Sequence, residues 1–338
     1  MEVKNHRYLW VDYAKGICIL AVVCLYVNSN AQHYFGESGF LQYFVDFAKP
    51  FRMPDFFLLS GLFLAKAIDK PFKHYLDRKV LHYLYFFFLW TFISWVLRIL
   101  IGELDEDPIG LIKSFISMSI IWPFHQLWFI LMLPLYFFAT RVTRKVPVWI
   151  MFPVLCGLHL LQSYPEYQFK YPILNDFNER FVFFYSGYVF APLIFNLAEK
   201  ISKHGFYSIL GIVIWFCVNS LLVFNGYSKH GVMTLLLGFA GCIGVIAIAV
   251  MLMQCQKGTR WLSYLGGHSI AIYLPFDWIL IGLSALTASA FIQINVNIYA
   301  FVMVVLTVVA SILLYWLSRP VPGLRNLFIR PNWIKLVK

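Results

Sequence analysis

The sequence predicts an all-α, polytopic membrane protein with about ten transmembrane helices, and three observations support this prediction. Of its 338 residues, 61% are hydrophobic and 13% are charged, and the mean hydropathy is +0.73, far above that of soluble domains. Ten stretches stay apolar over about the 20 residues that one bilayer crossing needs. Aromatic residues make up 19% of the chain, which suits lipid-facing surfaces and interfacial belts.

The predicted spans are joined by short connections, so we expect one membrane-embedded domain over residues 1–338. The spans lie at about 10–28, 45–65, 80–101, 122–140, 146–162, 180–198, 206–225, 232–253, 264–286 and 296–317. Connections on the side of the N-terminus carry basic residues such as Lys66 and Arg144, whereas those on the other side carry acidic ones such as Asp46 and Glu179. This alternation follows the positive-inside rule. We therefore expect both termini in the cytoplasm and the protein in a cytoplasmic (inner) membrane.

The formal net charge of +11 does not indicate nucleic-acid binding, because the basic residues are scattered between apolar runs and form no patch. The six Cys residues lie in or beside apolar segments without CxxC or metal-ligand spacing. The sequence therefore predicts no nucleic-acid partner, no disulfide, no metal site and no permanently bound cofactor.

The first predicted span carries two ionisable residues, Asp12 and Lys15, inside an apolar stretch. Such residues cost a few kcal/mol on insertion, so they usually have a partner, a wet cavity or a function. Lys15 and Tyr26 are eleven positions apart, which places them on nearly the same helix face, about 16 Å apart along the axis. One stripe then links a charge near one interface to a phenol in the opposite half of the bilayer. In the alternative interpretation, Asp12 and Lys15 simply pair near the interface.

The second predicted span contains a basic and an acidic residue three positions apart, Arg52 and Asp55. Pro54 is expected to interrupt the helix, and Ser60 precedes a glycine that permits close helix contact. Counted along the helix, Arg52 reaches a depth comparable with that of Tyr26, so the two side chains are in a position to meet. An Arg–Asp pair that only holds two helices together is the alternative.

Three further sites hold candidate binding residues. Arg78 and Lys79 belong to a basic collar in the first inner connection, where they either bind the phosphates of a cytoplasmic ligand or only anchor the topology. Trp128 lies toward the outer end of the fourth span, either in an aromatic belt or in a cavity wall. Arg180 begins the sixth, beside an acidic neighbour with which it forms a surface ion pair in the alternative interpretation.

Six short pieces, found in order along most of the chain, resemble the integral-membrane family often called acyltransferase 3. They are Trp10–Gly16, Phe51–Gly61, Asp77–Lys79, Leu127–Phe129, Glu179–Gly187 and Gly267–Tyr273. Members of this family are similar in having ten helices and in moving acyl groups, commonly acetyl, from cytoplasmic acyl-CoA to hydroxyls of extracytoplasmic acceptors. The resemblance implies acyl-CoA as donor substrate, a hydroxylated carbohydrate or glycolipid as acceptor, and membrane lipids as surroundings.

The sequence departs from the family pattern at the expected catalytic base. The pattern has a basic residue, ten further residues and then a His, whereas this chain has Lys15 and then Tyr26. Imidazole titrates near a pKa of about 6.5 and accepts protons at neutral pH, but a phenol with a pKa of about 10 can only donate. The ninth span similarly has Phe276, followed by Asp277, where many members have a His.

Three functions remain open from the sequence. An enzyme could hydrogen-bond the acceptor or the acyl carbonyl through Tyr26 and take its base from Asp12, Asp55, Asp277, His33 or His125. A degenerate member would bind its ligand and transfer nothing, and a lipid or solute transporter would use the same polar interior. The resemblance and the polar positions together give Tyr26, Asp12 and Asp55 as catalytic candidates. The substrate-binding candidates are Lys15, Arg52, Ser60, Arg78, Lys79, Trp128 and Arg180.

Overall fold

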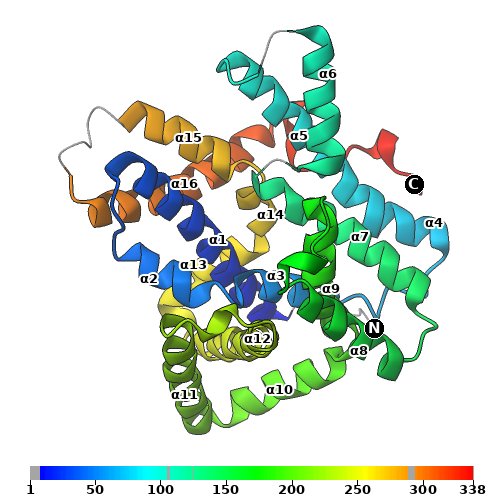
Figure 1. Ribbon diagram of the computed structural model, residues 1–338, viewed down its shortest axis with the longest axis vertical. Helices are drawn as coiled ribbons and strands as arrows, with labels where there is room; N and C mark the ends of the chain where they lie inside the picture. Colours follow the sequence, from blue (N-terminus) through cyan, green and yellow to red (C-terminus); the bar gives the residue numbers. More distant parts are fainter. Residues whose placement is uncertain (1–7, 105–106, 124, 288–293, 338) are drawn as a thin grey trace.

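The computed structural model describes residues 8–104, 107–123, 125–287 and 294–337 (Figure 1). Within these ranges all regular secondary structure is helical and no β-strand occurs. The all-α prediction is therefore confirmed.

Sixteen α-helices follow one another along the described chain. They are α1 (Leu9–Phe35), α2 (Leu41–Ala48), α3 (Arg52–Gly61), α4 (Phe72–Tyr75), α5 (His82–Leu100), α6 (Pro108–Ile116), α7 (Trp128–Thr143), α8 (Val148–Leu161), α9 (Pro172–Val189), α10 (Ala191–Lys203), α11 (Gly205–Phe224), α12 (Gly231–Gln254), α13 (Gln256–Gly267), α14 (Ser269–Tyr273), α15 (Phe276–Thr287) and α16 (Val296–Ser318). A π-helical turn, η1 (Leu76–Leu81), joins α4 to α5 into one continuous helix.

Several of these helices are long and apolar enough to cross a membrane. Among the described residues, five pass by length and composition: α1, the continuous helix Phe72–Leu100, α11, α12 and α16. The bent pair of α9 and α10 makes a sixth if it is counted as one span. The polytopic prediction is confirmed, and the other predicted spans correspond to shorter or broken helices.

Prolines break three of the predicted spans. The second is divided at Pro50 into α2 and α3, the sixth into α9 and α10 with Pro192 in the first turn of α10, and the ninth at Pro275 before α15. A proline lacks the N–H that continues a helix and clashes with the preceding turn. Pro54, where an interruption was expected, instead lies in the first turn of α3, where no N–H partner is needed.

Helix α1 passes through the middle of the bundle and packs against α3, α12, α13 and α16 (Figure 1). Its closest approach is to α13, where a Cβ on Gly266 would lie 1.7 Å from the carbonyl oxygen of Asp12. A similar approach joins α3 to α9, where a Cβ on Gly187 would lie 2.0 Å from the carbonyl oxygen of Leu58. Small residues at these crossings let the backbones touch, as is common between membrane helices.

The two ends of α1 define two ends of the bundle. Near Lys15 lie the start of α5 and the segment 319–337 after α16, and we call this side the basic end. Near the other end of α1 lies α2, where Asn28 donates a hydrogen bond of 2.7 Å to Gln42. We call that side the far end.

Candidate functional site

Tyr26 lies on α1 where α3 and α15 approach it. Its ring packs edge to face on the ring of Phe276, with 5.0 Å between the centroids. Arg52 and Asp277 are its electrostatic neighbours, one cationic and one anionic. Counting depth along two helices led us to expect Arg52 here. Asp277 lies here because the helix is interrupted at Pro275 and the chain continues as α15. The first residues of α15 lie toward α1.

Arg52 is the first residue of α3 and is only 8% exposed. Its Nη1 donates a long hydrogen bond of 3.5 Å to the carbonyl of Val45, and its buried Nε has no hydrogen-bond partner among the described residues. No ion pair joins Arg52 to Asp55, although both belong to the described chain. The guanidinium therefore keeps donors available for a ligand.

Asp55 points into a different environment, between α1, α3 and α12. It is 2% exposed, and its electrostatic neighbours are the thiols of Cys18 and Cys242. Its Oδ2 has no hydrogen-bond partner within the described structure. Asp55 does not line the cavities described below, and it is not among the electrostatic neighbours of Tyr26.

A cavity of about 750 Å³ opens at the far end beside Arg52, and we call it the Arg52 cavity. Its polar lining includes Asp46, His159, Glu179 and Arg180 from three different helices. Charges of both signs and a buried imidazole thus surround one space. Such a lining suits a ligand with several hydroxyls, because both donors and acceptors are present.

Arg180 is held in place on three sides. It forms ion pairs with Asp176 and, at 2.9 Å, with Glu179. Its guanidinium carbon lies 4.7 Å from the ring centre of Trp128. The two candidates Trp128 and Arg180 are therefore in contact, and Arg180, which lines the Arg52 cavity, is more than a surface ion pair.

His159 is a cavity residue that sequence reasoning missed. Its Nδ1 lies 2.5 Å from the carbonyl oxygen of Glu179, and its Nε2 lies 2.9 Å from Oγ1 of Thr234. The ring is thus fixed by both nitrogens between α8, α9 and α12. The sequence carries no signal for it, because His159 stands alone in an apolar run without any motif spacing.

At the basic end, a cavity of about 770 Å³ is lined by Arg78, His82, Arg330, Asn332 and Lys335, and we call it the Arg78 cavity. Most of its cations therefore come from two segments that are far apart in sequence. The contribution of the segment after α16 could not be predicted, because these residues follow no helical periodicity and lie beyond the last span.

A buried ion pair attaches that last segment. Arg330 pairs with the carboxylate of Asp77 and donates a hydrogen bond of 2.6 Å to the Asp77 carbonyl. The backbone N–H of Leu336 donates to the same carboxylate at 2.9 Å. Asp77 is thereby neutralised, so the charge that remains toward the cavity is positive.

A smaller cavity of about 240 Å³ adjoins the first and shares His82 with it. Its lining includes Asp12, Lys15 and the loop at His268, so we call it the Lys15 cavity. Asp12 and Lys15 therefore lie at the basic end, on the opposite side of Tyr26 from the Arg52 cavity.

Two of the predicted binding residues point elsewhere. The ammonium group of Lys79 lies 4.8 Å from the ring centre of Phe137 and does not line the Arg78 cavity. The hydroxyl of Ser60 donates a hydrogen bond of 2.7 Å to the Phe56 carbonyl in its own helix. The side chain of His125 lies outside the described part of the chain. No group of three or more His, Cys, Asp or Glu that could hold a metal ion occurs among the described residues.

Comparison with known families finds one match that covers most of the chain. A family model described as an acyltransferase domain matches residues 8–316. Searches of curated proteins and of solved structures find no significant match. The matched range contains α1 to α16 almost completely and excludes the segment that carries Arg330 and Lys335.

Proposed function

This chain belongs to the acyltransferase 3 family of membrane acyltransferases, and we propose that it transfers an acyl group, acetyl in the first instance, from cytoplasmic acyl-CoA to a hydroxyl of an extracytoplasmic carbohydrate or glycolipid. The inner membrane is the proposed location, with the basic end in the cytoplasm as the positive-inside rule requires.

The observation that carries this proposal is the course of α1 between two cavities. Lys15 lines the cavity at the basic end, and Tyr26, about 16 Å further along the helix, neighbours Arg52 in the wall of the far-end cavity. In the proposed reaction, a donor that enters from one end and an acceptor that enters from the other meet beside Tyr26.

The donor's nucleotide part is assigned to the Arg78 cavity. Arg78, Arg330 and Lys335 supply cations for phosphate groups, and charge-assisted hydrogen bonds to phosphate are among the stronger ones in proteins. The acyl-bearing arm then extends past His82 into the Lys15 cavity, toward the middle of α1.

The proposed chemistry uses three side chains. The acceptor hydroxyl attacks the thioester carbonyl while Asp277 takes its proton, and Arg52 stabilises the oxyanion that forms. The carbon–sulfur bond then breaks, and the CoA thiolate leaves and takes up the proton that Asp277 accepted, which returns Asp277 to its carboxylate. Tyr26 donates a hydrogen bond to the acyl carbonyl or the acceptor.

Asp277 is preferred as base over the other carboxylates because of its position. It neighbours Tyr26, whereas Asp12 lines the donor side and Asp55 is enclosed by thiols. In proteoliposomes given labelled acetyl-CoA and a panel of sugars and glycolipids, this proposal expects label on an acceptor hydroxyl. Binding of CoA without transfer to any acceptor would favour the ligand-binding interpretation, and solute movement without CoA binding would favour a transporter.

A further inference from the structure

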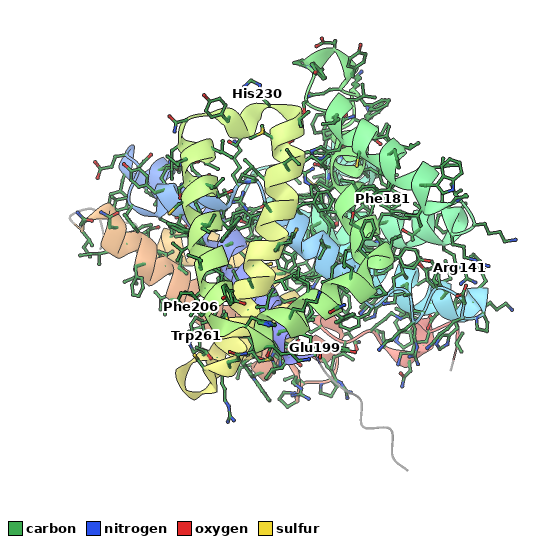
Figure 2. The ribbon with its side chains drawn as sticks, turned by 90° about the horizontal axis from the view of Figure 1, so that it is seen from below. Arg141, Phe181, Glu199, Phe206, His230 and Trp261 are labelled. Carbon is green, nitrogen blue, oxygen red and sulfur yellow. The ribbon has the colours of Figure 1, made fainter. Side chains whose placement is uncertain are left out.

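A groove of about 450 Å³ between α10, α11 and α12 takes no part in the proposed reaction. Its walls are mainly apolar and include Leu197, Ile201, Gly211, Ile212, Ile243 and Ala247. Figure 2 shows α11 and α12 side by side, joined at the His230 turn, with Glu199 and Phe206 at the opposite end of the pair.

The groove faces the lipid and opens at the membrane interface. Helix α11 has a mean hydropathy of 2.1 and few buried residues, so its outer face must contact lipid. Helix α10 is bent by 73° from α9 and buries one apolar face while its polar residues stay exposed. A helix of this kind lies along the interface. The groove therefore begins at headgroup level and runs along α11 for about 16 Å, from His204 to Trp215.

Lys200 stands at the headgroup end of the groove. It is exposed and forms no ion pair with any described side chain. Lys203, three residues later, is instead paired with Glu199 at 2.6 Å. The side-chain amide of Gln254 donates to the Ser202 carbonyl at 2.7 Å and so ties α10 to α12 at this end.

The apolar part of the groove has space for a chain. A Cβ on Gly211 would meet nothing within 4 Å. At the deep end the indole of Trp215 covers Gly244, where a Cβ would lie 2.5 Å from the ring. Trp215 therefore closes the groove, and Gly211 leaves its middle open.

We propose that this groove binds one anionic phospholipid, with its phosphate at Lys200 and an acyl chain along Gly211 toward Trp215. Basic positions between membrane helices on the positively charged side are suited to acidic headgroups. The charge at the mouth of the groove, which lies at interfacial depth, matches the phosphate headgroup of such a lipid. The open apolar channel matches its acyl chain. The proposal is independent of the acyl-transfer reaction.

The test uses the purified full-length protein in nanodiscs that contain phosphatidylglycerol or phosphatidylcholine with brominated acyl chains, because bromine quenches nearby indole fluorescence. The part of the quenching that is absent in the Trp215→Phe variant reports lipid bound in the groove. We expect half-maximal groove quenching at a concentration of brominated phosphatidylglycerol that is about fivefold lower than that of brominated phosphatidylcholine. A preference of this size is expected when one basic side chain contacts an acidic lipid. Lys200→Gln should abolish this preference, and the matched variant Lys203→Gln should keep it.

A second variant tests the channel itself. Gly211→Leu fills open space and improves helix propensity, so it should fold and lose the Trp215 quenching. Gly157→Leu in α8, where a Cβ also meets nothing within 4 Å, is the control and should behave as wild type. Equal quenching by both lipids, or equal loss of preference in Lys200→Gln and Lys203→Gln, would overturn the proposal. A dimer in native mass spectrometry that Gly211→Leu dissociates would assign the groove to a second copy of the chain instead.

Discussion

The ring of Tyr26 in α1 meets the ring of Phe276 in α15 edge to face, with the two planes at 86°. These are the two positions at which the resemblance to acyltransferase 3 proteins leads us to expect His. The chain therefore carries an aromatic contact, of a type worth about 0.5–1.5 kcal/mol, where the expected pattern would place two imidazoles. Asp277 and Arg52 remain beside this contact as the charged groups of the proposed reaction.

The assignment of Asp277 as base predicts an unequal response of the buried carboxylates. Asp277→Asn should lower acetyl transfer about 10²–10⁴-fold, the usual contribution of a general base, while Tyr26→Phe should lower it about tenfold because one hydrogen bond is lost. Steady-state rates in proteoliposomes measure both. If Asp55→Asn abolished transfer in a folded protein and Asp277→Asn did not, the base would be Asp55.

The Arg78 cavity predicts that two adjacent basic residues differ in donor binding. Arg78→Gln should weaken CoA binding about 10- to 100-fold, since a hydrogen bond to a charged group contributes about 1.5–3 kcal/mol. Lys79→Gln should have a smaller effect, because its ammonium group lies over Phe137. Titration of CoA at two salt concentrations measures the difference, and an equal loss in both variants would contradict the cavity assignment.

The ion pair between Asp77 and Arg330 predicts strong destabilisation when one partner is removed. Their side chains are 6% and 3% exposed, so Arg330→Met leaves a buried carboxylate without its cation and should cost about 3–5 kcal/mol. The thermal unfolding midpoint in detergent should fall, and residues 319–337 should become sensitive to protease. Lys203→Met, which breaks an exposed pair, is the control and should change little. A wild-type midpoint in Arg330→Met would show that the pair does not hold the segment.

The contact between α3 and α9 predicts that Gly187 tolerates no side chain. Gly187→Ala would bring a Cβ 2.0 Å from the backbone of Leu58, which forces the helices apart and should cost about 1–3 kcal/mol or more. Thermal unfolding should show a lower midpoint than in wild type, whereas Gly157→Ala should not be destabilised, since it has open space. Equal midpoints for the two variants would show that the crossing is not close-packed.

Hydrophobic runs were enough to predict the long helices. The predicted ranges 10–28, 206–225, 232–253 and 296–317 each correspond to one continuous helix, because membrane insertion demands an unbroken apolar stretch. The breaks at Pro192 and Pro275 were not predicted, since an apolar run looks the same whether or not the helix bends. The bend after α9 matters, because it turns α10 by 73° from α9, and α10 then forms one wall of the groove.

Contacts in the candidate site could be predicted only where two residues share a helix, or where their depths in the membrane can be counted along two predicted spans. The stripe from Lys15 to Tyr26 follows from helix periodicity, and the meeting of Tyr26 with Arg52 follows from depth along two spans. The positions of His159 and Arg330 depend on tertiary contacts with Glu179 and Asp77, which no local pattern reveals. For the same reason, the absence of an ion pair between Arg52 and Asp55 was not foreseen.

The most direct test of the central claim is transfer of labelled acetyl groups from acetyl-CoA in inverted membrane vesicles, measured for wild type and Tyr26→His. The account predicts label on an acceptor hydroxyl with wild type, and a higher rate with Tyr26→His, because an imidazole that accepts protons near neutral pH would then stand where the acyl group and the hydroxyl meet. No label with either protein, while both still bind CoA, would contradict it.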